Sequence, residues 1–375
     1  MRVRNKKQSL ITEKLKAQSK ESGNCKTMRT LFTYLPAMTA LLASAVYCPM
    51  ADADNSPTTK SGDLTGTVVV VNQASDSVTL VDLEKMEAYR HVSVVGGPHE
   101  VAISNDGKRA VVTNYRKRGG TPQKTLSLIS LPDGATIRTI DLGEFSTPHD
   151  VQWVNDSQIV CTAEADQALL LVNVESGEIE RVFKTGKNGS HMLALSKDQK
   201  RLYSSNMFGS GSISVFDFQS GQKIKDIDTG KECEGVGVTP DGRWLWAGNR
   251  AEDTVSIIDT EKLEIVKTLE SPGFPYRVEF TPNGKLALVP HARSGSLMVG
   301  NVASQEVVRY IPLKLTRVDE PSTAGVFPHP DNIHAFVTVR NDNSMLVINL
   351  ETGETLARVE VQSSPDGVAY SPVQR

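Results

Sequence analysis

The sequence has few cysteines and few aromatic residues, and it contains only one long apolar run. These shortages narrow the kinds of protein that it can encode. Only 4 of 375 residues are cysteine, and 6% are aromatic. Outside the first 53 residues only Cys161 and Cys233 remain, and no Cys-x-x-Cys or Cys/His zinc spacing occurs. This argues against covalent haem and structural zinc. One long-range disulfide stays open, but we expect two buried free thiols.

Basic residues are scarce in the body of the chain. From residue 54 onward, 32 Lys and Arg stand against 41 Asp and Glu, whereas residues 1–53 hold nine basic and three acidic side chains. Nucleic-acid binding needs basic side chains to neutralise phosphates, so we expect no nucleic-acid partner.

The long apolar run lies near the N-terminus, from Leu31 to Tyr47, and is followed by Ala51-Asp52-Ala53. A basic region, an apolar core and a small-x-small sequence in this order are typical of a secretory signal peptide. We expect residues 1–53 to be a leader whose signal core is 28–53. Cleavage after Ala53 would give a periplasmic or secreted protein.

Some features of the leader stay open. The true start is either Met1 or Met28, and Cys48 leaves a lipoprotein as a minor alternative. The apolar run is short and contains Pro36, which disfavours a membrane anchor, so no transmembrane segment is expected in the mature form. Residues 54–64 are rich in Ser, Thr, Asp and Gly and are expected to be a flexible linker.

From residue 65 to the end, one phrase of short apolar runs recurs about every 42 residues. Its clearest copy extends from Cys233 to Leu269 and contains four runs of strand length, separated by turn signals such as Pro240-Asp241-Gly242. We name these strands A to D. A repeat of this length with four strands is the period of a β-propeller blade.

Seven copies can be counted from the expected starts of the A strands and ends of the B strands. The A strands are expected to begin at His99, His149, His191, Glu234, Tyr276, Ala324 and Asp366. The B strands are expected to end at Asn72, Asn114, Glu164, Asn206, Asn249, His291 and Arg340. The first copy lacks an A strand and the last consists of one, so the strand near Val368 should pair with the strand near Val69.

The sequence therefore predicts an all-β fold over residues 65–375. The fold is a seven-bladed β-propeller of four-stranded antiparallel blades, closed by the C-terminal strand joining the N-terminal blade.

The ends of the B strands also carry a recurring motif. Val111-Val112-Thr113-Asn114 and the degenerate Tyr203-Ser204-Ser205-Asn206 resemble the phrase that names the YVTN-repeat (40-residue repeat) β-propeller family of the WD40/YVTN-like superfamily. The Asn side chains are expected to cap the turns. The resemblance covers roughly residues 66–372. It implies the fold but no single activity, because related propellers include lactonases, the copper-bearing domain of nitrous oxide reductase and the haem d1 domain of nitrite reductase.

The starts of the A strands and the ends of the B strands should meet at one mouth of the central channel, because A and B form a hairpin. We expect a ligand-binding site there, built from His99, Glu100, His149, Asp150, His191, Glu234, Arg277, His291 and Arg340. Two extra segments, Arg116–Lys124 and Lys314–Pro321, should emerge on the same face, which favours it as the binding face.

Three chemistries are open for this mouth. His99, His149 and His191 could hold a divalent metal, the only cofactor that the sequence suggests. His149 and Asp150 could act as a general base with an orienting carboxylate, and they are the catalytic candidates if the protein is an enzyme. Alternatively, the mouth is simply polar, with side chains that are solvated or hydrogen-bonded between blades. Positive charge beginning at Arg116 could steer an anionic ligand.

We therefore expect an exported, monomeric propeller that binds a small ligand or a protein partner through one channel mouth. An enzymatic role is not favoured. The alternative is a lactonase-like hydrolase or a metal- or tetrapyrrole-binding accessory protein that uses the mouth histidines and carboxylates.

Overall fold

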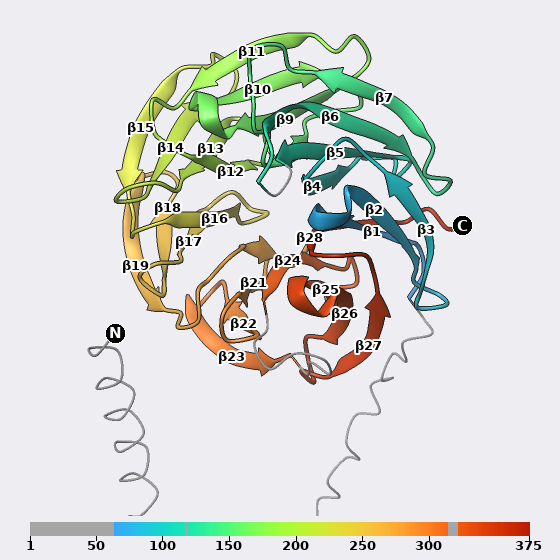
Figure 1. The fold of residues 1–375 in the computed structure, drawn as a ribbon. Coiled ribbons are helices and arrows are strands. Elements are labelled where there is room, and N and C mark those ends of the chain that lie inside the picture. The colour runs from blue at the N-terminus through green and yellow to red at the C-terminus, as the bar shows by residue number, and fades with distance from the viewer. Residues whose placement is uncertain (1–63, 117–118, 314–321) are drawn as a thin grey trace, which may run out of the picture. The chain divides into compact units, whose positions relative to one another are not determined.

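Seven four-stranded antiparallel sheets are arranged in a ring around a central axis (Figure 1). The computed structural model describes residues 64–116, 119–313 and 322–375. The leader, its cleavage position, the linker up to residue 63 and the extra segment Lys314–Pro321 lie outside these residues. The predicted all-β, seven-bladed architecture is confirmed.

Each blade has one strand at the axis and three successive strands outside it. Blade 1 contains β28 (Pro365–Ser371), β1 (Thr67–Asn72), β2 (Ser77–Asp82) and β3 (Glu87–Ser93). Blade 2 contains β4 (Pro98–Ile103), β5 (Arg109–Arg116), β6 (Pro122–Ser130) and β7 (Thr136–Asp141). Blade 3 contains β8 (Val151–Trp153), β9 (Gln158–Ala163), β10 (Ala168–Asn173) and β11 (Ile179–Lys184). Blade 4 contains β12 (Ser190–Leu195), β13 (Arg201–Asn206), β14 (Ser212–Asp217) and β15 (Lys223–Asp228).

The remaining three blades have the same plan. Blade 5 contains β16 (Cys233–Val238), β17 (Trp244–Asn249), β18 (Thr254–Asp259) and β19 (Glu264–Glu270). Blade 6 contains β20 (Glu279–Phe280), β21 (Leu286–His291), β22 (Ser296–Asn301) and β23 (Glu306–Pro312). Blade 7 contains β24 (Thr323–Pro328), β25 (His334–Val339), β26 (Ser344–Asn349) and β27 (Thr355–Glu360). Short 3-10 helices follow three of the B strands: η2 (Gln73–Ser75), η3 (Glu164–Asp166) and η4 (Arg340–Asp342).

The two ends of the propeller close the ring within blade 1. Val69 pairs with Ala369 and Val70 pairs with Val368, which makes the last strand of the chain the axial strand of the first blade. This pairing satisfies the main-chain edge that β1 would otherwise expose. The closure predicted from the missing first A strand is confirmed.

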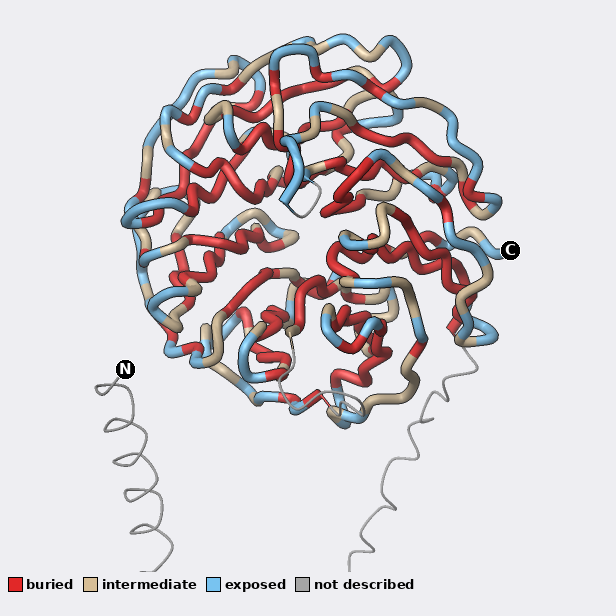
Figure 2. The backbone as a smooth tube through the Cα atoms, viewed as in Figure 1, coloured by how far each residue is buried: buried red, intermediate tan, exposed pale blue. Residues whose placement is uncertain are grey.

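The core lies between blades rather than within them. The described residues form seven apolar clusters, and each joins neighbouring blades, as when Leu126 and Leu128 of blade 2 pack with Leu170 of blade 3. Strands B and C are therefore apolar on both faces, whereas the outermost strands are largely exposed (Figure 2). Burial on both faces explains the continuous apolar runs in the sequence.

Several sequence expectations can be compared with local structure. Leu64 is buried against blade 1 and blade 7. The segment after Arg116 lengthens the hairpin, because Arg116 pairs with Pro122. Cys161 and Cys233 are buried free thiols.

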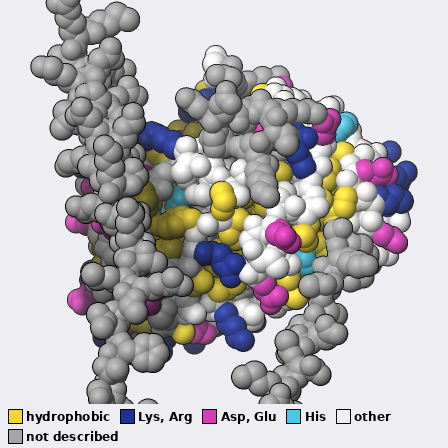
Figure 3. All heavy atoms as spheres, turned by 90° about the horizontal axis from the view of Figure 1, so that it is seen from below, with side chains coloured by type: hydrophobic (Ala, Val, Ile, Leu, Met, Phe, Trp, Pro, Cys, Tyr) yellow, Lys and Arg dark blue, Asp and Glu magenta, His cyan; other side chains and the backbone are white. Residues whose placement is uncertain are grey.

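The described surface is mixed in character, and none of the described helices is long and apolar enough to cross a membrane. In the view from below, acidic and basic side chains are interspersed among hydrophobic and neutral ones (Figure 3).

Candidate functional site

A bulge at the start of strand A brings two successive residues to the axis. In blade 2, Pro98 pairs with Asn114 but Val101 pairs with Val112, so β4 carries one extra residue between these pairs. The register shifts in the same way in β12, β16, β24 and β28. A strand without a bulge would point alternate residues away from the axis. The bulge explains why both His99 and its neighbour Glu100 take part in axial contacts.

The Thr of the YVTN-like motif joins neighbouring blades at this bulge. The Glu100 amide donates to Thr113 Oγ1 at 2.9 Å, and the Thr113 hydroxyl donates to the His149 carbonyl of the next blade, also at 2.9 Å. Thr162, Ser205 and Thr338 repeat the contact between later blades. One hydroxyl therefore satisfies two main-chain groups that the bulge removes from regular strand pairing.

The Asn of the motif fixes strand B to strand C. The Asn114 side-chain amide donates to Thr125 Oγ1 at 2.9 Å and to Ser127 Oγ at 3.0 Å. Asn206 makes equivalent bonds to Ser212 and Ser214. The expectation that these side chains cap the turn therefore gives only part of their role, since they reach strand-C hydroxyls.

Three imidazoles form a stack at the axis. The ring centroids of His99 and His149 are 3.8 Å apart, and those of His149 and His191 are 3.6 Å apart. The Tyr115 ring lies edge-on to His99 and His149, with centroids 5.2 and 5.0 Å away. The three histidines that open adjacent blades are thus brought together, but all are buried.

His191 lies between two carboxylates. Its Nδ1 is 2.6 Å from Glu164 Oε2, and its Nε2 is 2.8 Å from Glu234 Oε1. Burial opposes the charged ring, but Glu234 and Glu164 outweigh it and raise the pKa of His191 to about 9. In the other direction, His191 and Arg277 hold the pKa of Glu234 well below its ordinary value despite burial. His191 is therefore an imidazolium at neutral pH, with both nitrogens occupied.

Arg277 connects the acidic residues on the other side of the axis. Its Nε donates to Glu100 Oε1 at 2.9 Å, and its Nη1 donates to Glu234 Oε1 at 3.1 Å. Its Nη2 lies 3.7 Å from Asp366 Oδ1. Removing the Arg277 charge would leave three buried carboxylates without their shared cation.

Arg340 completes the arrangement. It donates through Nη2 to Asp366 and to the Tyr276 hydroxyl, at 2.5 and 2.6 Å. The Tyr276 ring also faces the guanidinium carbons of Arg277 and Arg340, at 4.2 and 4.8 Å from its centroid. We call the resulting set the axial layer: His99, Glu100, His149, Glu164, His191, Glu234, Tyr276, Arg277, Arg340 and Asp366.

Glycines make room for this charge. A Cβ on Gly235 would lie 2.7 Å from the Arg277 Cα, and a Cβ on Gly367 would lie 2.6 Å from Glu100 Oε2. Both glycines occupy the strand position that Glu100 fills in blade 2. Glycine at position 235 therefore lets the Arg277 backbone approach closely, and glycine at position 367 leaves room for the Glu100 carboxylate.

His149 differs from its neighbours in having unpaired ring nitrogens. Both are buried and lack a hydrogen-bond partner among the described residues. Burial, followed by the nearby His191 and His99, holds the pKa of His149 well below its ordinary value, so the ring is neutral. A neutral ring with one free lone pair is the form that a metal binds.

Two overlapping groups of residues have the composition of a metal site. One consists of His99, Glu100 and His149, and the other of His149, Glu164 and His191; in each group, one ligand atom per residue lies within 4.8 Å of the others. The second group fits less well, because His191 would have to give up a carboxylate contact. The fit therefore favours His99 and His149 with Glu100.

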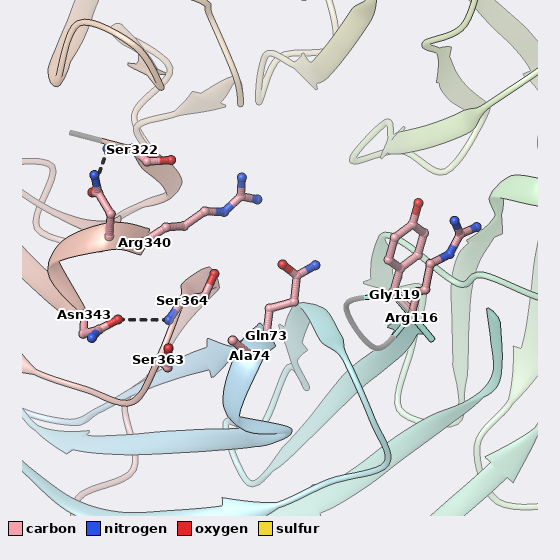
Figure 4. Close-up of a pocket in the computed structure, with 11 residues that line it drawn as sticks. Gln73, Ala74, Arg116, Gly119, Ser322, Arg340, Asn343, Ser363 and Ser364 are labelled. Carbon is pink, nitrogen blue, oxygen red and sulfur yellow. Dashed lines mark hydrogen bonds between the residues drawn. The ribbon is translucent and has the colours of Figure 1, made fainter. Parts of the chain in front are cut away.

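A cavity of about 710 Å³ lies at the mouth above part of the axial layer. Figure 4 places Arg340 and Arg116 on opposite sides of it, with Gln73 between them. The remaining lining residues are Ala74, Tyr115, Gly119, Ser322, Asn341, Asn343, Ser363 and Ser364. Gly119 belongs to the first extra segment and Ser322 directly follows the second. We call this cavity the mouth pocket.

Most of the predicted site residues come together, but most of them are buried inside the channel rather than exposed at an open mouth. His99, Glu100, His149, His191, Glu234, Arg277 and Arg340 meet in the axial layer. Asp150 instead accepts main-chain hydrogen bonds from Val151 and Leu193. The structure does not join His291 to the layer, because its ring nitrogens contact Ser271 and Ser296.

Sequence reasoning missed several residues. Tyr115 donates its hydroxyl to Glu164 at 2.8 Å, and Arg250 lies 2.6 Å from Glu234. Both directly follow the expected end of a B strand, at Asn114 and Asn249, so extending the search by one residue would have found them. Glu279 lies two residues after Arg277, and alternate residues of a strand share a face. The position of Arg277 could therefore have indicated Glu279 as a further channel-facing residue.

The ring of seven four-stranded blades defines a seven-bladed β-propeller. Residues 146–318 match the model of the family described as YNCE-like beta-propeller, which confirms the resemblance stated from the motif. No curated protein matches the sequence.

Two solved structures share the fold. One is hydrazine synthase of Kuenenia stuttgartiensis, with a TM-score of 0.65, 18% identity, and coverage of 80% of this chain and 99% of that chain. The other is a functionally unknown protein from Desulfotomaculum acetoxidans, with a TM-score of 0.68, 14% identity, and coverage of 82% and 99%. At these identities the likeness establishes the fold alone.

Proposed function

We propose that this protein is an exported propeller that binds a small anionic ligand in the mouth pocket. The observation that carries the proposal is the composition of that pocket. Its described lining contains Arg116 and Arg340, together with amide, hydroxyl and small side chains, and no carboxylate. On a body with an excess of acidic residues, such a pocket is a local positive site.

Arg340 is the anchor that we propose for the anion. Asp366 and Tyr276 fix its Nη2, while its Nε has no hydrogen-bond partner among the described residues. A guanidinium held in this way loses little conformational entropy when it binds a carboxylate or phosphate. Arg116, whose guanidinium carbon lies 5.5 Å from the Tyr115 ring centroid, would supply the second charge from across the pocket.

Titration calorimetry with inorganic phosphate, oxalate and citrate tests this proposal. At least one of these anions should bind, and Arg116→Gln should weaken binding about tenfold or more while the protein stays folded. Arg90→Gln, which removes an exposed arginine of β3, is the matched control and should change nothing. Absence of anion binding at millimolar concentration, or an equal loss in both variants, would overturn the proposal.

Export rests on the leader pattern, and a monomeric state is proposed with it. Sequencing the N-terminus of the protein purified from the periplasm should give Asp54 as the first residue. Recovery of the intact leader in the cytoplasm would overturn the export proposal. Light scattering of the mature protein should give the mass of one chain.

A second candidate is a metal-binding accessory role, which the neutral and unpaired His149 favours. His99 and Glu100 would join His149 as ligands of a divalent ion. Metal analysis of the mature protein should then find about one ion per chain, lost in His149→Ala. A metal-free protein that also fails to take up zinc, copper or nickel on dialysis would exclude this role.

A further inference from the structure

A second cavity of about 660 Å³ occupies the channel on the other side of the axial layer. It is lined by the axial strands from Glu100 onward and reaches the turns between strands A and B, at Asn105 and Pro282. Because the A strands begin at the mouth pocket, this cavity extends toward the opposite end of the channel. We call it the axial cavity.

The walls of the axial cavity combine apolar and polar groups. Aromatic rings come from four blades, with Trp153, Phe280, Phe327 and Tyr370 among the lining residues. Aliphatic side chains such as Leu193 fill the spaces between them. Such walls suit the hydrocarbon part of a small molecule and would contribute affinity in proportion to the apolar area buried.

The titratable groups of the cavity are mostly acidic. Glu100 on β4, Asp150 beside β8 and Glu279 on β20 line it with a single cation, Arg277, and a single phenol, Tyr370. Arg277 already contacts Glu100, Glu234 and Asp366 in the axial layer. Arg277 is therefore engaged by these carboxylates. Two other carboxyl groups of the cavity have no counter-ion among the described residues.

Glu279 and Asp150 are these two carboxyl groups. Asp150 accepts only main-chain amides, and no hydrogen bond or ion pair joins Glu279 to another described side chain. Burial, followed by the neighbouring Asp150 and Glu100, raises the pKa of Glu279 to about 8. Acidic groups that lack a counter-ion in a partly apolar cavity favour a positively charged partner.

We propose that the axial cavity binds an organic cation, an ammonium group carried on an apolar body. The ammonium group lies between Glu279 and Asp150, and the apolar body lies against Trp153 and Phe280. The aromatic faces add cation–π attraction for a quaternary ammonium. Because the bound cation favours the ionised form of Glu279, binding near pH 7 releases a proton to the solvent. This site is separate from the mouth pocket and does not depend on the anion proposal.

Titration calorimetry with hexyltrimethylammonium tests the inference, with hexanol as the uncharged probe. The ammonium compound should bind at least about tenfold more tightly than hexanol. Its apparent binding enthalpy at pH 7 should also change with the ionisation enthalpy of the buffer, which reports proton release. Equal binding of the two probes, or no binding of the ammonium compound at millimolar concentration, would overturn the proposal.

Two variants locate the site. Glu279→Gln should weaken ammonium binding about tenfold and reduce proton release, whereas Glu306→Gln, on the exposed edge of β23, should change neither. Glu279 makes no hydrogen bond to another described residue, so its replacement leaves the fold intact even if Asp150→Asn does not. Unchanged affinity in Glu279→Gln would place the cation elsewhere and contradict the inference.

Discussion

The imidazole of His149 stacks on that of His191 with ring centroids 3.6 Å apart, yet the two rings differ in charge. His191 is held as an imidazolium between Glu164 and Glu234, whereas burial and the charge of His191 keep His149 neutral. A neutral ring can stack on a charged one without repulsion between like charges. The contact between the two rings therefore accommodates one imidazolium but not two.

Alkaline pH should weaken the fold through His191. Its pKa in the folded state, about 9, lies above the ordinary value of 6.5. Its contacts therefore contribute fully below about pH 6.5, and the contribution is lost as the pH rises through about 9. A shift of this size corresponds to about 3 kcal/mol of unfolding free energy. Urea unfolding of the wild type and His191→Asn at pH 7 and pH 10 measures this loss of stability.

The difference between the two proteins is the quantity to compare, because it cancels the titration of Lys and Tyr elsewhere. It should be large at pH 7 and shrink at pH 10. A difference that stays constant between these pH values would show that His191 carries no extra proton in the fold.

Thr113→Val should destabilise the propeller although valine has nearly the same shape. The substitution leaves the Glu100 amide and the His149 carbonyl buried without their common partner. Each unsatisfied buried group costs about 1–3 kcal/mol. Chemical denaturation measures the loss, with Thr139→Val on the exposed face of β7 as the control. Equal stability of the two variants would mean that the contact between blades contributes little.

Arg277→Met should be among the most damaging single substitutions in the axial layer. The methionine keeps much of the side-chain length but leaves Glu100, Glu234 and Asp366 without their shared cation. Breaking buried ion pairs in this way costs about 3–5 kcal/mol. The midpoint of thermal unfolding should fall strongly at pH 7. Arg90→Met on exposed β3 should leave the midpoint unchanged.

The fold could be predicted from the sequence because its information is local and repeated. Each blade contains turn signals such as Pro240-Asp241-Gly242, and the incomplete first and last copies indicate how the ring closes. The axial composition could also be predicted, since the hairpin of strands A and B places His99 and His191 at the same end of the channel. Both inferences need only the order and spacing of the repeats along the sequence.

The charge pattern and the depth of the site could not be predicted. The axial contacts of both His99 and Glu100 depend on a bulge at the start of β4, and the sequence around Pro98 gives no direct sign of the extra residue. The separation of His291 from the layer depends on a three-dimensional contact with Ser271. The unpaired carboxyl of Glu279 likewise becomes visible only when the side chains of several blades are placed around the axis.

Nitrogen-15 NMR of the imidazole rings at pH 7.5 tests the central claim most directly, namely that the axial histidines form an ionic layer with one charged and one neutral ring. His191 should show two protonated ring nitrogens, and His149 should show one protonated and one bare nitrogen. Histidine-to-asparagine variants at the two positions assign the signals. A neutral His191, or a charged His149, would contradict the account.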